Sequence, residues 1–438
     1  MEILVMAAQI ILGLSILVGV HEMGHLLAAK AFGMRVEEFS IGFPPKIFSF
    51  KWGETEYALS LIPLGGFVKI SGMMDESLDK DQLAAPPEPW EFRSKPAWQR
   101  LIVMLGGIIV NVITGILIFV MLTWMNGSTY YSKDEVNKKG IVALPLGKEV
   151  GFKTGDKILK INGKDFEDFS DVYDPEVLIS NNSYYTVERD GKVIDLKIPK
   201  GFLEQYAEKS KTEGFVTPLS PYDVKEVIKG SGASKGGLEK GDKILSVNGH
   251  PTTYFNQLQA VLADNKDKTV SAVIDRGGKE KTLSIPIDKD GKMGFYPNDL
   301  LQVSHKDFTF GQSVVVGTDR AVKVVVTNAK GLWKMVTGEV NPASSLSGPI
   351  AIAQIYGGTW NWIKFWSITG LLSMVLAFMN LLPIPALDGG HVMFLLYEMI
   401  SGRKPGDKFM EIAQKTGMII LLSLMAFVIL NDVWKLFK

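Results

Sequence analysis

The chain contains no cysteine among its 438 residues and only five histidines. The absence of cysteine excludes disulfides and thiolate metal sites, and it leaves histidine, aspartate and glutamate as the strong metal ligands. An excess of one charge is also missing, because 47 basic residues balance 47 acidic ones. Nucleic-acid-binding proteins usually carry a broad basic surface, so this class of function is excluded and no nucleic acid partner is expected.

Charge is absent altogether from four apolar stretches. A helix needs about 18 or more such residues to cross the roughly 30 Å hydrocarbon layer. Residues 3–20, 101–125 and 366–387 are long enough, and residues 416–431 form a shorter fourth run. We therefore expect a polytopic α-helical transmembrane core with four spans in a multi-domain membrane protein.

The first apolar run has an alternative interpretation as a cleaved signal peptide. Met1 and Glu2 supply no basic start and the helical pattern continues through residues 21–29, so a transmembrane span is favoured. No lysine or arginine precedes this span, whereas Lys30 and Arg35 follow it. By the positive-inside rule, the N-terminus and the region between the second and third spans lie outside.

The region between the second and third spans contains an internal repeat. Residues 151–163 match residues 237–249 at eight of thirteen positions, and each copy combines a Gly-Asp turn, a short strand and an Asn-Gly turn. This pattern resembles PDZ domains, which bind extended peptides at a sheet edge, so peptide C-termini are candidate partners. Residues 227–233 before the second copy fit that family better than residues 144–150 before the first. Plain β-rich spacers are the alternative.

The segments around the repeat have weaker patterns. Residues 36–70 alternate between apolar and polar side chains and are interrupted by Pro44-Pro45 and by residues 63–66, which predicts short strands joined by turns. Residues 75–91 are acidic and proline-containing, and we expect a linker there. Apolar residues between positions 314 and 336 recur at helical spacing among basic ones, which predicts an amphipathic helix on the membrane surface or against the outer domains.

The motif His21-Glu22-Met23-Gly24-His25 gives the clearest chemical signal. Residues four apart share a helix face, so the two imidazoles can bind one metal ion while Glu22 lies beside them. Zinc activates water for attack on a peptide carbonyl, and Glu22 can accept the proton of that water. The alternative is a pair of hydrogen-bonded histidines at a helix end. Ionisable residues that continue an apolar helix are costly, which favours the metal site.

A catalytic zinc site needs a third protein ligand. Spans one and three are expected to run in the same direction, and His21 and Asp388 then lie within roughly 10 Å of the same depth, at about 1.5 Å of helix per residue. We therefore expect Asp388 to bind the metal. His391 is the rival ligand, although a helix-end role or a role in orienting a ligand suits it better.

The stretch from Asn380 to His391 contains two prolines and two glycines. Broken backbone at membrane depth survives only where protein buries it or where it lines a wet cavity, which hydrolysis requires. Asn380 precedes Asp388 by eight residues, so we expect it on the same helical side, where its amide can hold a substrate backbone or an oxyanion. An interhelical hydrogen bond is the alternative.

These residues together resemble the site-2 protease family of intramembrane zinc metalloproteases along nearly the whole chain. The His21 to His25 motif resembles the family's first-span zinc motif, and the stretch from Asn380 to His391 resembles its third-span motif, whose aspartate is the third ligand. Residues 347–353 also fit. Residues 57–70 are similar to the family's membrane-dipping β loop, which implies that Gly65, Gly66, Phe67 and Val68 bind the substrate in extended form.

One motif departs from the family pattern. Gly106-Gly107 precedes Asn111 where relatives often have Gly-Pro, so the resemblance only weakly implies a substrate contact by Asn111. Otherwise the resemblance implies a zinc metalloendopeptidase of the bacterial inner membrane, with Zn²⁺ as cofactor and Glu22 as catalytic base. Its partners are the lipid bilayer and single-span membrane proteins already trimmed by another protease, such as anti-sigma factors or remnant signal peptides.

The same resemblance implies an active site near the cytoplasmic face and PDZ-like domains on the periplasmic side, where they act as a size filter or docking gate. Two other functions stay open from the residues alone. A catalytically inactive membrane PDZ scaffold is disfavoured by the intact Glu22. A zinc transporter is disfavoured because the spans offer few ligands for a path across the bilayer.

The expected order of parts is a first transmembrane helix with the zinc motif (1–30), a cytoplasmic-side β-rich loop and linker (31–97) and a second transmembrane helix (98–126). Two tandem PDZ-like domains follow (127–215 and 216–300), and then an amphipathic membrane-surface segment (301–345). The third transmembrane region with the aspartate motif (346–391), a cytoplasmic loop (392–415) and a fourth transmembrane helix (416–435) complete the chain.

Overall fold

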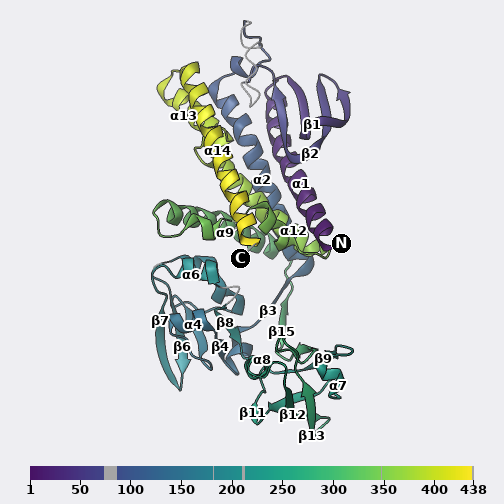
Figure 1. Cartoon of the computed structure of the whole chain (residues 1–438). Coiled ribbons are helices and arrows are strands. Elements are labelled where there is room, and N and C mark those ends of the chain that lie inside the picture. Colours follow the sequence, from purple (N-terminus) through teal and green to yellow (C-terminus); the bar gives the residue numbers. More distant parts are fainter. Residues whose placement is uncertain (74–85, 181, 210–212, 347, 437–438) are drawn as a thin grey trace. The chain divides into compact units, whose positions relative to one another are not determined.

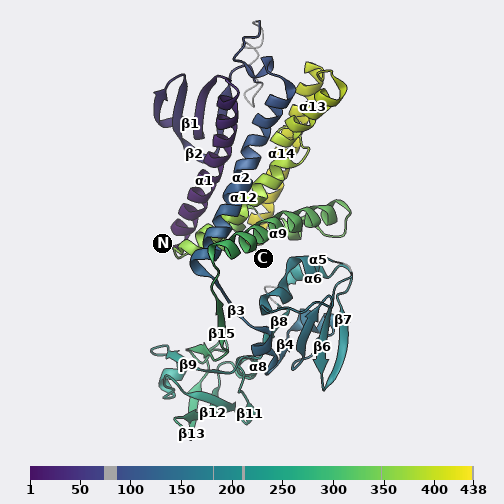
Figure 2. The same cartoon turned by 180° about the vertical axis from the view of Figure 1, so that it is seen from behind.

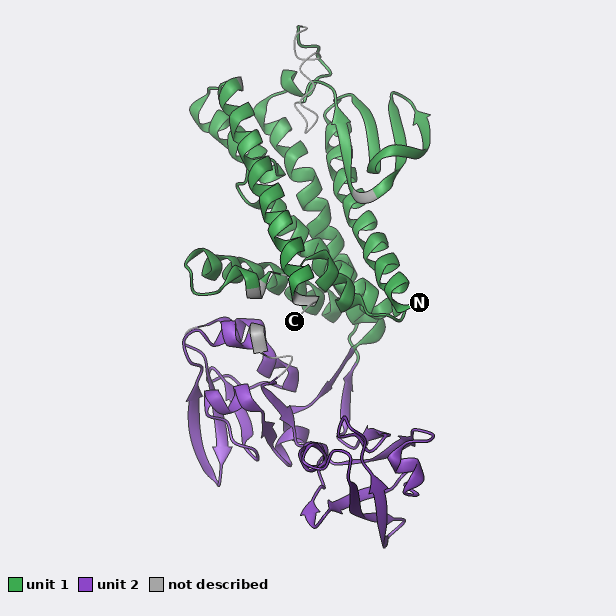
Figure 3. Ribbon diagram, in the orientation of Figure 1, with its two compact units in different colours: residues 1–127, 307–438 green, residues 128–306 purple. Residues whose placement is uncertain are grey.

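The computed structural model describes residues 1–73, 86–180, 182–209, 213–346 and 348–436. Residues 75–85 of the expected linker, and residue 347 of the motif at 347–353, lie outside these ranges. The chain divides into two compact units, which are described one at a time (Figure 3). Unit 1 comprises Met1–Gly127 and Asp307–Lys438, and unit 2 comprises Ser128–Lys306.

Four helices of unit 1 are long and apolar enough to cross a membrane. They are α1 (Glu2–Ala31), α2 (Ala97–Asn126), α12 (Trp362–Leu381) and α14 (Asp407–Leu436) (Figures 1 and 2). Near its start, α1 packs Ile10 with Phe365 at the start of α12. Further along, His21 of α1 lies beside Asn380 at the end of α12. The first and third spans therefore run in the same direction, as the sequence predicts.

Helices α1 and α2 pack against each other at Gly24 and Gly106. A Cβ atom on Gly24 would lie 2.3 Å from the carbonyl oxygen of Gly106, and one on Gly106 would lie 2.6 Å from the carbonyl oxygen of Gly24. Small residues allow membrane helices to approach backbone to backbone in this way. Because Gly24 lies within the histidine motif, this crossing places α2 directly against it.

The apolar stretch at 366–387 is not one helix, which corrects the sequence-based prediction. Helix α12 ends at Leu381, and α13 (Asp388–Ser401) begins at Asp388. Pro383 lacks a backbone N–H and disfavours helical geometry in the residue before it. Asn380 and Asp388 therefore lie on different helices. The expected loop at 392–415 is also largely helical, because α13 continues to Ser401 and α14 begins at Asp407.

Strands β1 (Val36–Trp52) and β2 (Thr55–Ile70) form an antiparallel pair, and changes of register divide both into shorter paired segments of the kind that the sequence predicts. The strand β1 changes register around Gly42, whose φ is 93°. Residues 38–41 pair with residues 66–69 on one side and with residues 56–59 on the other. The pair therefore folds into a small sheet in which residues 66–69 lie along one edge.

The remaining elements of unit 1 are η1 (Phe92–Ser94), α9 (Phe310–Val336), α10 (Pro342–Ser345) and α11 (Pro349–Tyr356). Helix α9 is the expected amphipathic helix. Its small residue Gly317 contacts the backbone of Val120 on α2, while Val315 and Val336 are 70% and 73% exposed. One face of α9 is thus packed within unit 1.

Unit 2 contains two similar β-rich copies, each with its own hydrophobic core. The first copy has β4 (Ile141–Ala143), α4 (Pro145–Val150), β5 (Lys157–Ile161), β6 (Tyr184–Arg189), β7 (Lys192–Lys197) and β8 (Val216–Pro218). The second has β9 (Tyr222–Val227), α7 (Gly232–Lys235), β10 (Lys243–Val247), β12 (Thr269–Arg276), β13 (Lys279–Pro286) and β14 (Phe295–Asp299). Strand β8 pairs with β4 as β14 pairs with β9, so the first copy extends past the expected boundary at residue 215.

Shorter elements complete unit 2. They are β3 (Ser128–Tyr131), α3 (Lys133–Asn137), η2 (Phe169–Tyr173), α5 (Pro175–Ile179), α6 (Phe202–Lys209), β11 (His250–Pro251), α8 (Phe255–Ala263) and β15 (Val303–Lys306). The first and last strands, β3 and β15, pair with each other. The unit therefore closes at Lys306 rather than at the expected residue 300.

Both copies contain the same buried ion pair. Asp156 is 1% exposed and accepts two hydrogen bonds of 2.7 Å from Arg189, and Asp242 is 0% exposed and accepts two of 2.7 Å from Arg276. Each arginine also donates to the carbonyl of a glycine that begins the repeated motif, Gly151 or Gly237. The repeat in the sequence thus corresponds to a repeated tertiary contact.

Candidate metal centre

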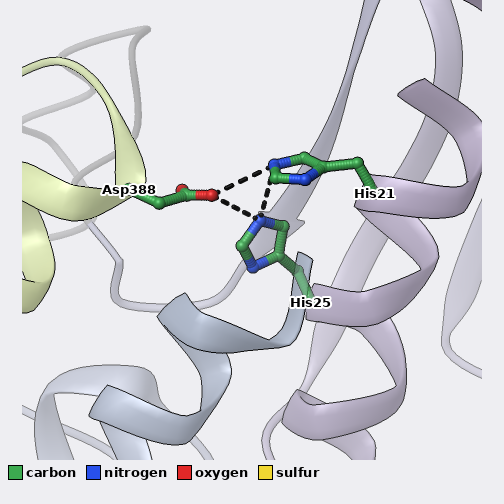
Figure 4. Close-up of side chains that lie close together, drawn as sticks. All are labelled: His21, His25 and Asp388. Atoms are coloured by element: carbon green, nitrogen blue, oxygen red, sulfur yellow. Dashed lines mark hydrogen bonds and ion pairs between the residues drawn. The ribbon is translucent and has the colours of Figure 1, made fainter. Parts of the chain in front are cut away.

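Three side chains from two ends of the chain converge in unit 1. His21 and His25 project from one face of α1, and Asp388 projects towards them from the start of α13 (Figure 4). His21 Nε2 lies 3.0 Å from Asp388 Oδ2 and 3.2 Å from His25 Nε2, and His25 Nε2 lies 3.3 Å from Asp388 Oδ2. Both histidines are less than 10% exposed.

The geometry of these three atoms fits a zinc ion. Nitrogen and oxygen ligands lie about 2.0–2.2 Å from zinc, so two ligands of a tetrahedral site are roughly 3.4 Å apart. The three observed separations are 3.0, 3.2 and 3.3 Å. Asp388 Oδ2 is buried, and within the described part of the chain it has no hydrogen-bond donor besides these two imidazole nitrogens. Such an unsatisfied carboxylate oxygen between two imidazole nitrogens is expected where a cation is bound.

Both imidazole rings are held from α2. His25 Nδ1 lies 2.8 Å from the carbonyl oxygen of Val103, to which it donates, so the lone pair of its other nitrogen points at Asp388. His21 Nδ1 lies 3.2 Å from the amide of Asn111. Between these contacts, a Cβ atom on Gly107 would lie 2.5–2.7 Å from atoms of both rings. Only glycine leaves room for the imidazoles at this position.

A cavity of ≈ 590 Å³ opens beside the three ligand atoms. It is lined by Glu22, by Asn380 and His391 from the third-span region, by Gln414 of α14, and by the edge residues Gly65, Gly66, Phe67 and Val68 of β2. Gly66 lies close to Glu22, because a Cβ atom on it would be 3.3 Å from Cγ of Glu22. The cavity thus brings a candidate metal site, a carboxylate and a strand edge together.

The predicted site residues are placed as follows. Among the described residues, His21, His25 and Asp388 form a cluster whose side chains could hold a metal ion, and His391 lines the cavity without belonging to that cluster. The amide of Asn380 lies 3.3 Å from His21 Nε2 although a helix break separates it from Asp388. Asn111 is 0% exposed and contacts His21, which is a different environment from the substrate contact that the sequence suggested.

Three contributors were not predicted from the sequence. The carbonyl of Val103 and the side chain of Gln414 belong to no recognisable motif, and Gly107 stood out in the sequence only because it departs from the Gly-Pro of the family. The positions 103, 107 and 111 are four apart and therefore share a face of α2. That spacing is the signal in the sequence that connects Val103 and Gly107 with Asn111.

Comparison with known proteins identifies a matching family and several relatives. The profile of Peptidase family M50 matches residues 9–424. Regulator of sigma-E protease RseP of Escherichia coli is 30% identical, with 97% of each chain covered. A putative zinc metalloprotease of Fusobacterium nucleatum is 29% identical, with 98% of each chain covered, and a putative zinc metalloprotease of Neisseria meningitidis is 27% identical, with 97% of this chain and 98% of the relative covered.

Proposed function

This chain belongs to Peptidase family M50, the site-2 protease family of zinc metalloproteases, and we propose that it hydrolyses peptide bonds within membrane-spanning segments of other proteins. The observation that carries the proposal is the convergence of His21 Nε2, His25 Nε2 and Asp388 Oδ2 within 3.3 Å. The two histidines lie on α1, which is long and apolar enough to cross a membrane, and Asp388 begins α13, which follows the candidate span α12. In this proposal these three residues hold zinc and Glu22 is the catalytic base.

Bound zinc supplies Lewis acidity for the attacking water and the scissile carbonyl. Glu22, one residue after His21 on α1, accepts the proton of the water and returns it to the leaving amine. The amide of Asn380 lies 3.3 Å from His21 Nε2 and donates to the carbonyl oxygen as negative charge develops there. The glycine contact between Gly24 and Gly106 keeps α1 and α2 fixed while this occurs.

The substrate must be locally unwound, because the carbonyl groups of a helix are already hydrogen-bonded. An extended segment can pair instead with a free strand edge. Residues 66–69 pair with β1 on one side, and Gly65, Gly66, Phe67 and Val68 line the catalytic cavity. We propose that this edge of β2 binds the unwound segment beside Glu22.

The finer features rest on the resemblance and on the charge pattern. We propose that the two copies of unit 2 are PDZ-like domains on the periplasmic side of a bacterial inner membrane, and that the active site lies near the cytoplasmic face. Relatives are named regulators of sigma-E protease. By analogy, the substrates are single-span proteins trimmed by another protease, such as anti-sigma factors, and the PDZ-like copies dock or filter them.

The test compares purified wild-type protein with Glu22→Gln, measuring bound zinc by mass spectrometry and cleavage of a single-span substrate in liposomes. A protease keeps its zinc in the variant and loses cleavage. Zinc flux across the liposome in both proteins would indicate a transporter. Equal cleavage by both proteins would remove Glu22 from the mechanism.

A further inference from the structure

On the side of α2 that faces the histidines, the residues that contact them recur at a regular spacing. Val103, Gly107 and Asn111 are four residues apart, and each meets a histidine ring in a different way: with a carbonyl oxygen, with a missing side chain, and with an amide. The first two contacts are explained by hydrogen bonding and by space. The third is a buried side-chain amide whose chemistry the proposed mechanism does not use.

Zinc binding dictates where the protons of these rings lie. A neutral imidazole that binds metal through Nε2 carries its proton on Nδ1, and an acceptor normally holds that proton. His25 meets this requirement, because its Nδ1 lies 2.8 Å from the carbonyl of Val103. His21 needs an equivalent acceptor. The group at its Nδ1 is the side-chain amide of Asn111, 3.2 Å away.

The amide of Asn111 has two possible orientations. With Nδ2 towards His21, it offers a donor to Nδ1, which would place the ring proton on Nε2, the atom that faces Asp388. In this orientation Oδ1 is buried and has no hydrogen-bond partner in the described part of the chain. Rotating the amide by 180° brings Oδ1 to Nδ1 and moves no other atom. That orientation is the one compatible with metal binding by His21.

We propose that Asn111 is a positioning residue whose side-chain oxygen accepts a hydrogen bond from Nδ1–H of His21 and so directs Nε2 to the metal. This inference rests on the zinc site proposed above. Asn111 is suited to the role because it is 0% exposed and because its backbone carbonyl accepts a 2.8 Å hydrogen bond from Ser373 of α12, which anchors that turn of α2. Its burial keeps water from replacing it as the acceptor.

The proposal also explains the whole Gly106-Gly107 to Asn111 motif. Gly106 permits the backbone contact with Gly24, Gly107 leaves space for the two rings, and Asn111 orients one of them. The motif is therefore an outer support of the metal site carried by a second helix. Residues that orient metal ligands typically change metal affinity by about 10- to 100-fold when removed.

The experiment compares Asn111→Asp with Asn111→Leu in the full-length protein. Asp is nearly the same size as Asn, and its carboxylate can only accept a hydrogen bond from Nδ1–H of His21, whereas Leu fills similar space and cannot accept one. Zinc dissociation constants are measured by competition with a chromophoric chelator, and kcat and KM are measured at saturating zinc. Asn111→Leu is expected to weaken zinc binding about 10- to 100-fold, and Asn111→Asp to bind zinc within a few-fold of wild type.

Two further variants make the result unambiguous. Thr123→Val removes another fully buried polar group from α2, far from the histidines, and is expected to leave zinc affinity unchanged. His21→Ala tests the zinc site itself, and retention of zinc by this variant would reject the proposed function rather than the role of Asn111.

Wild-type zinc affinity in Asn111→Leu would overturn the positioning role, and a raised KM alone would make Asn111 a substrate contact. Equal weakening in the Asp and Leu variants would also overturn it, because a donor or a packing role predicts that pattern.

Discussion

Buried carboxylates in the two units differ in what surrounds them. In unit 2, both oxygens of Asp242 accept hydrogen bonds from Arg276, and Oδ2 also accepts one of 2.8 Å from the backbone N–H of Glu239. Asp156 has the same three bonds in the first copy, from Arg189 and from the N–H of Lys153. In unit 1, Asp388 Oδ2 is buried, and among the described residues the two imidazole nitrogens are its only possible donors.

The difference distinguishes a carboxylate that stabilises the fold from one that can bind a ligand. A buried carboxylate whose two oxygens both accept hydrogen bonds from an arginine has little capacity left for a ligand, and its ion pair stabilises the fold of one copy. A buried oxygen that the protein leaves unsatisfied can be satisfied by a cation instead. The number of protein donors around a buried acid therefore indicates which of the two roles it has.

The largest effect is expected at the unsatisfied acid. Asp388→Ala removes one of three ligands, so zinc affinity should fall by at least about 100-fold, more than for loss of a group that only orients a ligand. Cleavage should fall to background. His391→Ala is the matched variant, because His391 lines the same cavity outside the cluster. It should keep its zinc, as measured by mass spectrometry of the purified proteins.

The reverse result would identify His391 as the third ligand. The contrast between the acids of the two units would then no longer hold, since the buried Oδ2 of Asp388 would have no metal to bind.

The next largest effect on zinc affinity is expected at Gly107, where the two imidazole rings leave no space for a side chain. In Gly107→Ala the new methyl group would lie 2.5 Å from His21 Cε1 and 2.6 Å from His25 Nε2, so both rings must move. We expect roughly 10- to 100-fold weaker zinc binding, as for other changes that misplace a ligand. Chelator competition measures it.

Gly115→Ala is the control on the same helix. Its methyl group would meet the flexible side chain of Met374, which can move aside. Zinc affinity should stay at the wild-type value. If the two alanine variants bound zinc equally well, contact of α2 with the rings would not constrain the site.

Part of this site was accessible from the sequence. The spacing of His21 and His25 fixes a shared helix face, and the uncharged runs fix the direction of α1 relative to α12, so the approach of Asp388 was predictable. The helix break at Pro383 was visible as composition, but its position relative to Asn380 depends on where α12 ends. Propensity does not locate such ends, because tertiary packing decides them.

The contacts that hold the two imidazole rings could not be predicted from the sequence in the same way. Val103 contributes a backbone carbonyl and Gly107 contributes empty space, and neither has a chemical signature in a sequence. The pairing of residues 38–41 with two segments of β2 could not be predicted, because alternating apolar and polar residues indicate strands without indicating which segments pair.

A smaller effect is expected at the strand edge beside Glu22. Val68→Pro removes one backbone N–H from β2, and the loss of one hydrogen bond is worth about 0.5–1.5 kcal/mol, or roughly 2- to 10-fold in kcat/KM. Zinc content should not change. Val68→Thr keeps the N–H and the β-branched shape and should cleave at the wild-type rate. Unaltered turnover of a membrane substrate by the proline variant would count against strand addition.

In unit 2 the effect should appear in stability and not in zinc binding. Arg189→Met leaves Asp156 buried without its two arginine bonds, which should destabilise the first copy by roughly 2–3 kcal/mol. Hydrogen exchange of the full-length protein, followed in peptides from β5 and β6, measures this. Faster exchange in β10 and β12 as well would show that the two copies unfold together.

The smallest effect is expected when both members of that pair are replaced. In Asp156→Leu with Arg189→Met no charge is left buried, and exchanges of a buried ion pair for apolar residues are often close to neutral. Asp156 also accepts from the N–H of Lys153, so a residual cost of about 1 kcal/mol is expected from that lost bond. Recovery of most of the protection lost in the single variant would identify the pair as a replaceable structural contact. No recovery of zinc binding is expected from an apolar residue at Asp388. Such a residue can pack in the folded protein, but it has no atom that can bind the ion.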